Sequence, residues 1–346
     1  MPRFLSSCLL VALLAFSAFS LSGCASSARP VEKPDQVVWP PPPLEPRVAW
    51  VESISSSKDV TGERGFWRRV ADLVLGEQVV RIARPYGIHV DRQRRIMVAD
   101  PGARVVHIME RATGRYRVVQ GTEVGGFLSP VGVTADGGGA GYLTDSAAAR
   151  VYRFSLDGLK AEPFVAKGLK RPTGIVYSPA NGLIYVSDTL AGQVVAFNGQ
   201  GRESLRFGSP GELPGQFNRP TDLAVDRKGR VVVTDALNCR IQIFSPEGRF
   251  IRAFGRPGDV SGTFAKAKGV AVDSRGHLHV CDALFDTVQV FDEQGTLLLS
   301  YGARGGGKGE LWMPSGIYID DSDTVYVADT YNNRVQVFQY LNAAAD

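Results

Sequence analysis

A short segment recurs six times between residues 85 and 338, and this repeat limits the fold more than any other feature of the sequence. Its copies are PYGIHVD at 85–91, PVGVTAD at 130–136, PTGIVYS at 172–178, PTDLAVD at 220–226, AKGVAVD at 267–273 and PSGIYID at 314–320. Each copy precedes an apolar stretch that ends in aspartate, at Asp100, Asp145, Asp188, Asp235, Asp282 and Asp329. These aspartates are 45, 43, 47, 47 and 47 residues apart, a period that indicates one supersecondary unit per repeat.

A third stretch follows each aspartate at a nearly constant distance, beginning at Arg104, Arg150, Gln193, Arg240, Thr287 and Arg334. All these stretches are short, rich in β-branched and aromatic residues, and bounded by turn residues, which is typical of strands. A fourth strand is expected in the middle repeats, as in RFIRAFG at 249–255. The pattern predicts an all-β chain, a six-bladed β-propeller of four-stranded antiparallel blades.

The number of strands predicts how the ring closes. The sixth repeat ends near Tyr340 without an outer strand, whereas RVAWVESI at 47–54 precedes the first blade and has no partner of its own. The N-terminal strand is therefore expected to complete the last blade and remove an open sheet edge. The predicted propeller covers 47–340, with a pre-blade segment at 55–84 that contains a helical pattern at 67–76, and a tail follows at 341–346.

The last repeat, PSGIYIDDSDTVYVADTYNNRVQVF at 314–338, resembles the NHL repeat almost position for position. The chain departs from the NHL pattern at Gln193 and Thr287, where Arg is usual, at Ala267 in place of Pro, and at Asp222 in place of Gly. The resemblance implies a propeller scaffold. Some NHL proteins are ubiquitin ligases through a separate RING domain, but the Cys/His ligand set of such a domain does not occur in this sequence.

The first 23 residues have the layout of a signal peptide, with Arg3 followed by an uncharged apolar run. The run ends in Leu21-Ser22-Gly23-Cys24, which resembles a lipobox, whose cysteine is lipidated and becomes the new N-terminus. An uncleaved membrane anchor is the alternative, because about 20 apolar residues can also span a bilayer. Either interpretation places the chain in the cell envelope. Ala25 after the cysteine resembles a signal for the outer membrane, facing the periplasm, if the source has two membranes.

Residues 24–46 are expected to form a tether, since the stretch 29–46 contains seven prolines and no apolar period. Extended polyproline II chain rises about 3.1 Å per residue, which gives this stretch a reach of roughly 50 Å. Removal of residues 1–23 changes the formal charge from +4 to +3, because only Arg3 is lost. A charge this small argues against nucleic acid as a partner. Cys239 and Cys281 remain, and a disulfide between them is compatible with an oxidising compartment.

The repeated Asp and Arg, as in Asp100 with Arg104 and Asp329 with Arg334, suggest chemistry at first sight. A residue needed once for catalysis should not recur in every blade, so these pairs are expected to be structural turn caps. His277 and His279 alternate along one strand and share a face, which is a minimal metal pairing, and His89 on an inner strand can supply a third ligand. Packed histidines are the alternative interpretation.

Basic residues precede most of the Pro-Xaa-Gly turns and should surround one mouth of the central channel. They are Arg84, Arg171, Arg219 and Lys266, with Lys268 in the next ring of positions. Converging cations attract an anionic ligand or an acidic protein surface, although a solvated rim is the alternative. The sequence favours a monomeric, lipid-anchored scaffold without a cofactor, which docks an envelope protein or anionic ligand at this mouth. The alternative function is a metal-dependent hydrolase or lyase that uses the channel, His89, His277, His279 and Asp222.

Overall fold

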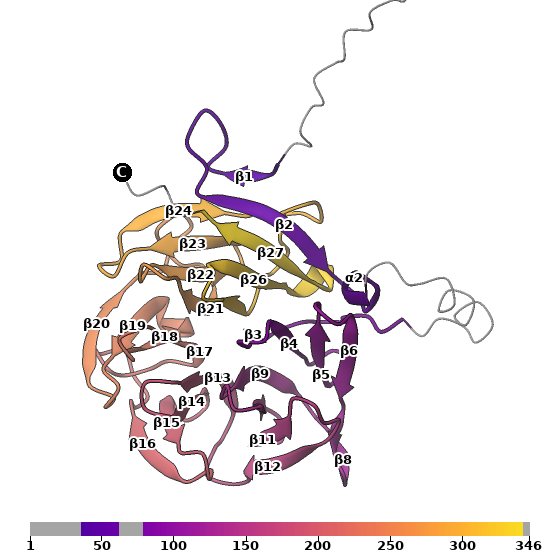
Figure 1. Cartoon of the computed structure of the whole chain (residues 1–346). Helices are drawn as coiled ribbons and strands as arrows, with labels where there is room; N and C mark the ends of the chain where they lie inside the picture. Colours follow the sequence, from indigo (N-terminus) through magenta and orange to yellow (C-terminus); the bar gives the residue numbers. More distant parts are fainter. Residues whose placement is uncertain (1–35, 62–78, 342–346) are drawn as a thin grey trace, which may run out of the picture. The chain divides into compact units, whose positions relative to one another are not determined.

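The short β-branched and aromatic stretches are strands in the computed structural model, which describes residues 36–61 and 79–341. They form six small antiparallel sheets that stand as blades around a common centre, so the predicted six-bladed β-propeller is confirmed (Figure 1). The chain divides into two units after Gln36, and the propeller lies in the second. The predicted signal peptide (1–23), the helical pattern at 67–76 and the tail from residue 342 lie outside the described residues.

The first three blades follow the chain from their inner to their outer strands. The first contains β3 (Ile88–Val90), β4 (Arg95–Asp100), β5 (Val105–Glu110) and β6 (Arg115–Val119). The second contains β9 (Pro130–Ala135), β10 (Ala140–Asp145), β11 (Arg150–Ser155) and β12 (Ala161–Val165). The third contains β13 (Pro172–Ser178), β14 (Leu183–Asp188), β15 (Gln193–Phe197) and β16 (Glu203–Phe207).

The next two blades have the same layout. The fourth contains β17 (Pro220–Val225), β18 (Val231–Asp235), β19 (Arg240–Phe244) and β20 (Phe250–Phe254). The fifth contains β21 (Ala267–Val272), β22 (Leu278–Asp282), β23 (Thr287–Phe291) and β24 (Leu297–Tyr301). Smaller elements connect or flank the blades: α2 (Lys58–Thr61), η1 (Ala236–Asn238), η2 (Thr330–Asn332), and a hairpin of β7 (Gly121–Thr122) and β8 (Gly125–Gly126).

The sixth blade is built from both ends of the propeller. Its strands are β25 (Ile317–Ile319), β26 (Thr324–Asp329), β27 (Arg334–Tyr340), β2 (Val48–Ile54) and β1 (Val38–Trp39). β2 pairs antiparallel with β27, from Val48 opposite Tyr340 to Ile54 opposite Val335. Figure 1 shows this junction, where the indigo β2 lies beside the yellow β27. The N-terminal strand therefore completes the last blade, as the number of strands predicted.

The short strand β1 adds a fifth strand that the sequence did not indicate. Trp39 packs against Phe338 and Tyr301, with ring centroids 5.7 and 6.3 Å apart. The residues after Gln36 thus belong to the propeller, although they lie within the segment 24–46 that the sequence assigned to a tether. The prolines at 40–43 and 46 serve a turn between β1 and β2 here, because Trp39 and Val48 are paired in register.

The core of the propeller lies between neighbouring blades. Phe244 on β19 is buried against Phe207 of the preceding blade and Phe217 of the connecting loop, at centroid distances of 4.9 and 5.4 Å. Each middle strand is covered on both faces by its neighbours, as in β18, where all residues are buried. Only the inner strand of each blade reaches the centre. Among the described residues, none of the helices is long and apolar enough to cross a bilayer.

The six repeated aspartates hold the loop that leads into each blade. Their carboxylates are buried and accept hydrogen bonds from backbone N–H groups that precede the inner strand. Asp188, for example, accepts from Lys170 and Arg171, both at 2.8 Å. Arg334 Nε lies 2.7 Å from Asp329, whereas Asp100 contacts His107 Nε2 at 3.2 Å in place of Arg104, which is exposed. These contacts agree with a structural role for the repeated carboxylates.

Replacement of Trp39 by Ala is expected to lower the free energy of unfolding by about 2 kcal/mol, because it removes the aromatic contacts that fix β1 to the last blade. Urea denaturation of the two proteins measures the difference. Trp312→Ala is the matched control, since Trp312 is 44% exposed, and it should change stability by less than about 1 kcal/mol. Equal losses in both variants would contradict a structural role for β1.

Candidate functional site

The inner strands come into backbone contact at the third position of each repeat copy, where five residues are Gly and the sixth is Asp222. A Cβ atom at Gly87 or Gly316 would clash with the carbonyl oxygen of the neighbouring inner strand. The N–H groups of these glycines donate to Val131 and Tyr86 at 2.9 and 3.0 Å. This ring of residues separates a cavity of about 270 Å³ on one side from a small one of about 20 Å³ on the other.

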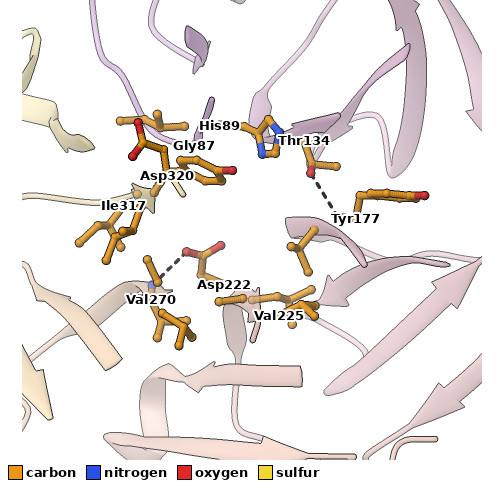
Figure 2. Close-up of a pocket in the computed structure, with 18 of the residues that line it drawn as sticks. Gly87, His89, Thr134, Tyr177, Asp222, Val225, Val270, Ile317 and Asp320 are labelled. Carbon is orange, nitrogen blue, oxygen red and sulfur yellow. Dashed lines mark hydrogen bonds between the residues drawn. The ribbon is translucent and has the colours of Figure 1, made fainter. Parts of the chain in front are cut away.

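Asp222 places a carboxylate where the other blades have no side chain. Figure 2 shows it pointing into the open centre, with Oδ2 accepting the N–H of Val270 at 3.2 Å. Burial raises the pKa of Asp222 from its ordinary 3.8 to about 7, because desolvation outweighs the backbone N–H groups of Leu223 and Val270, which favour the charged form. The carboxyl group is therefore close to half ionised at neutral pH.

The larger cavity extends from this ring to the turns after the inner strands. Apolar residues such as Ile175, Leu223 and Val270 form much of its wall. His89 also lines it, with its ring 4.7 Å from that of Tyr318. Burial lowers the pKa of His89 to about 4, so this imidazole is neutral at physiological pH.

The opposite mouth carries the predicted basic residues, and three blades direct groups toward Tyr86 there. Lys268 Nζ lies 5.0 Å from the centre of the Tyr86 ring and 3.4 Å from its hydroxyl oxygen. Burial and the charge of Asp222 raise the pKa of Tyr86 to about 12, while the charge of Arg171 opposes this shift. Charged groups from the third, fourth and fifth blades thus act on Tyr86, although the Arg171 side chain itself is exposed.

The other predicted cations lie further out on the same mouth. Arg84, Arg219 and Lys266 are exposed, and each lies in the loop before an inner strand. The guanidinium of Arg84 stacks 5.3 Å from the centre of the Tyr331 ring on the sixth blade. We call Arg84, Arg171, Arg219, Lys266 and Lys268 together the basic mouth.

Exposed apolar side chains lie in turns beside these cations, and they were not predicted from the sequence. They lie two residues after the repeated aspartate, at Leu190, Leu237, Leu284 and Tyr331, joined by Trp312, and are between 44% and 64% exposed. Backbone hydrogen bonds tie these turns to the residues beside the basic mouth, as in Leu237 N–H to Asn218 at 3.1 Å. We call these five residues the apolar arc. The sequence feature that could have predicted this arc is the apolar residue that recurs two positions after the repeated aspartate, in a turn.

Tyr86 was also missed, although its position was informative. The second residue of each repeat copy faces the narrow part of the channel, and five of the six are Val131, Thr173, Thr221, Lys268 and Ser315. Tyr86 is the aromatic member of this set. The sequence could have indicated Tyr86, because it is a large aromatic residue at a position that smaller or aliphatic side chains occupy in the other repeats.

The three predicted histidine ligands do not form a metal centre. His277 and His279 both contact Asp273, through His277 Nδ1 at 2.9 Å and His279 Nε2 at 3.4 Å. His279 is also fully buried against Tyr301. His89 faces the channel, and no group of three His, Cys, Asp or Glu residues within residues 36–61 and 79–341 could hold a metal ion. The described residues therefore do not fit a zinc or calcium site: His277 and His279 pack around Asp273, and His89 lines the cavity.

The two remaining cysteines are free thiols. Cys281 is buried in β22, and burial raises its pKa well above the ordinary value. Cys239 lies in the turn before β19, where its backbone is left-handed. The disulfide that the sequence allowed is not formed, because the two positions in neighbouring repeats do not face each other.

Two family models match the chain. The model described as NHL repeat matches residues 311–338, which include the segment whose resemblance was noted above. The model described as SMP-30/gluconolactonase/LRE-like region matches residues 131–265, which span blades two to four.

Solved structures with the same architecture include proteins of different kinds. An auxiliary nutrient binding protein from Bacteroides thetaiotaomicron is 12% identical, with a TM-score of 0.61 over 77% of this chain and 71% of that chain. A streptogramin B lyase is 14% identical, with a TM-score of 0.57 over 76% and 95%. A chain of a nidogen/laminin complex is 17% identical, with a TM-score of 0.55 over 72% and 89%. At such identities the likeness establishes the fold alone.

The substitution Asp222→Asn is expected to stabilise the protein more at pH 8 than at pH 5. The folded-state pKa is raised to about 7, so ionisation of Asp222 opposes folding above the unfolded pKa, and this cost grows until the pH passes 7. The variant should gain on the order of 2 kcal/mol relative to the native protein between the two pH values. Denaturant unfolding at both pH values measures the gain. Asp259→Asn, at an exposed loop position, should show no such change with pH.

Proposed function

Because this chain is a six-bladed β-propeller that carries an NHL repeat, we propose that it is a binding scaffold that docks a protein partner on its basic mouth. The observation that carries the proposal is that the basic mouth and the apolar arc lie side by side at one end of the channel. The cationic side chains of the basic mouth form no ion pair within the described residues, which favours an acidic partner, and the exposed Leu, Trp and Tyr side chains favour one that also offers apolar surface.

The composition of this face supports a protein rather than a small anion. Binding energy at protein interfaces is concentrated in a few residues, among which Trp, Tyr and Arg are enriched. Arg84, Tyr331 and Trp312 form such a cluster, because Tyr331 stacks with Arg84 on one side and lies 5.6 Å from Trp312 on the other. A small anion would need the cations alone and would gain nothing from five exposed apolar side chains.

The similar structures support a scaffold without naming a partner. The nidogen/laminin complex holds a propeller of this architecture in a protein assembly, and another similar structure is that of an auxiliary nutrient binding protein. The match to the SMP-30/gluconolactonase/LRE-like region supports the competing enzyme function. We favour the scaffold because the described residues do not fit a metal centre, whereas the basic mouth needs no cofactor.

We further propose that Cys24 carries a lipid that anchors the propeller in the cell envelope, with residues 25–36 as the tether. The lipobox-like sequence and the prolines before Val37 support this placement. A domain held near a membrane meets membrane-bound partners at a raised effective concentration, which suits a scaffold of modest affinity.

Charge reversal of Arg84, Arg171 and Arg219 to Glu is expected to weaken partner binding at least about tenfold, because each change replaces an attraction with a repulsion. The partner is first identified by affinity capture from gently solubilised envelope, and binding of the purified pair is then measured. The matched control reverses Arg115, Arg202 and Arg249, which are exposed beside the outer strands of the same three blades.

Substitution of Leu237 and Leu284 by Ser distinguishes a protein partner from a small anionic ligand. A protein partner should lose affinity with these substitutions as well as with charge reversal. A small anion would respond to the charges alone. Equal binding by the native protein, the reversed variant and its control would contradict the proposed docking face.

The anchor is tested independently of the docking face. Cys24→Ser is expected to move the protein from the membrane fraction to the soluble fraction and to abolish labelling by a radioactive fatty acid, because the acylated thiol is lost. Cys8→Ser is the control, since this cysteine lies inside the predicted signal peptide. Continued membrane association of Cys24→Ser would contradict lipid anchoring and support a membrane-spanning N-terminal segment.

A further inference from the structure

The larger cavity lies at the other end of the channel from the basic mouth, and its charges have the opposite sign. Five aspartates line it, at positions 222, 226, 273, 320 and 321, against the single cation Arg227. Three of the five have nearby partners: Arg230 lies 2.6 Å from Asp226, Arg94 lies 3.3 Å from Asp320, and Asp273 is held by two histidines. The sign of the wall favours a cation over an anion.

Asp222 is the carboxylate at the floor of this cavity. Its hydrogen bonds come from the backbone N–H groups of Leu223 and Val270, and no cationic side chain in the described part of the chain contacts it. A partly buried carboxylate without a cationic partner carries a desolvation cost. A positively charged group placed above the floor would offset that cost.

Two orphaned hydroxyl groups flank the same carboxylate. Thr221 precedes Asp222, and Thr234 lies opposite it in the pairing of β17 with β18. Their buried Oγ1 atoms are among four buried side-chain atoms without a hydrogen-bond partner in the described residues. In the third blade the equivalent hydroxyls are satisfied, because Ser187 accepts the N–H of Gly174 at 2.9 Å and contacts Thr173 at 2.8 Å. Thr221 lines the small cavity on the other side of the ring and Thr234 is fully buried, so Asp222 is the member of this group that faces the larger cavity.

The remaining wall suits an apolar body of limited size. Ile175, Leu223 and Val270 present aliphatic surface, and the rings of His89 and Tyr318 add aromatic faces that attract cations. A volume of about 270 Å³ lies just below the usual range of roughly 300–1,000 Å³ for small-molecule pockets. The cavity therefore fits a small ligand with a single charged group.

We propose that this cavity binds a small organic cation, a primary ammonium group on an apolar body, with the Asp222 carboxylate as its counter-ion. This inference concerns a different site from the proposed docking face, so either can fail without the other. Asp222 determines the specificity, because the five other blades have glycine at the same position and leave room for the ligand above the ring.

The probe for this site is 2-phenylethylammonium, with the neutral 2-phenylethanol as its matched partner. Isothermal titration calorimetry or ligand-observed NMR is expected to show one site for the amine on the native protein. Asp222→Asn should weaken amine binding at least about tenfold, since it removes the charge but keeps the shape. Asp222→Gly, which introduces the glycine found in the other blades, should also weaken amine binding at least about tenfold. This second variant shows that the loss does not come from a folding defect specific to Asn.

The affinity for the amine should also fall as the pH is lowered from 8 to 5, by at least about tenfold, because protonation of Asp222 near pH 7 removes the counter-ion. Neighbouring groups are Tyr86, Cys281 and Lys268, with His89 on the wall. The raised pKa values of Tyr86 and Cys281 and the value of about 4 for His89 leave these groups unchanged over most of this range. Burial lowers the pKa of Lys268, so the pH dependence must be absent from Asp222→Asn if Asp222 is its source.

Three results would overturn the proposal. The first is the absence of amine binding up to about 10 mM, which is weaker than any useful affinity for a site of this kind. The second is equal binding of the amine and the alcohol. The third is unchanged amine binding in Asp222→Asn and Asp222→Gly. Asp259→Asn, which removes the same charge from an exposed loop, should bind as the native protein does.

Discussion

Six inner strands meet near the axis of this propeller with their backbones in close contact, and most of the contact points accommodate only glycine. Backbone hydrogen bonds from Gly87, Gly269 and Gly316 join neighbouring inner strands. A side chain at Gly87, Gly269 or Gly316 would strike the neighbouring backbone. The close contact therefore fixes where the channel narrows and separates the cavity from the basic mouth. It also explains why one substitution in this ring has a large effect, since Asp222 brings a charge to a point where the fold otherwise places no side chain.

The loops around the basic mouth depend on a second constraint, the repeated buried carboxylates. Each aspartate binds backbone N–H groups of the loop that enters the inner strand of its own blade, as Asp282 does with Ala265 and Lys266 at 2.8 and 3.0 Å. Because these bonds engage only the backbone, the side chains at the same positions are free to vary. The propeller can thus change its binding surface, from Ser129 in one blade to Arg171 in the next, without altering its turns.

The repeat predicted the fold class, the number of blades and the closure by the N-terminal strand, because period and strand pattern are local signals that six copies reinforce. The strand β1 was not predicted, since its contacts of Trp39 with Tyr301 and Phe338 are distant in sequence and seven nearby prolines suggested extended chain. The basic residues could be placed at one mouth from their position before each inner strand. The partnership of Arg84 with Tyr331 and the contact of His279 with Tyr340 of the last blade depend on packing between blades, which no single repeat reveals.

The two ends of the channel differ in a way that follows from where their side chains originate. At one end, the basic mouth consists of residues before the inner strands, and the apolar arc lies in or beside the exposed turns after the second strands. This end is therefore broad and presents cations together with apolar groups to large ligands. At the other end, residues of the inner strands and of the turns that follow them form the wall of the cavity. This end is therefore narrow and is lined by carboxylates. Asp222 lies where these regions meet, and its charge influences Tyr86 on the basic side while its carboxylate faces the cavity. Ionisation of one buried group therefore connects the electrostatics of the two ends, and a cation held in the cavity would keep that group ionised beneath the basic mouth.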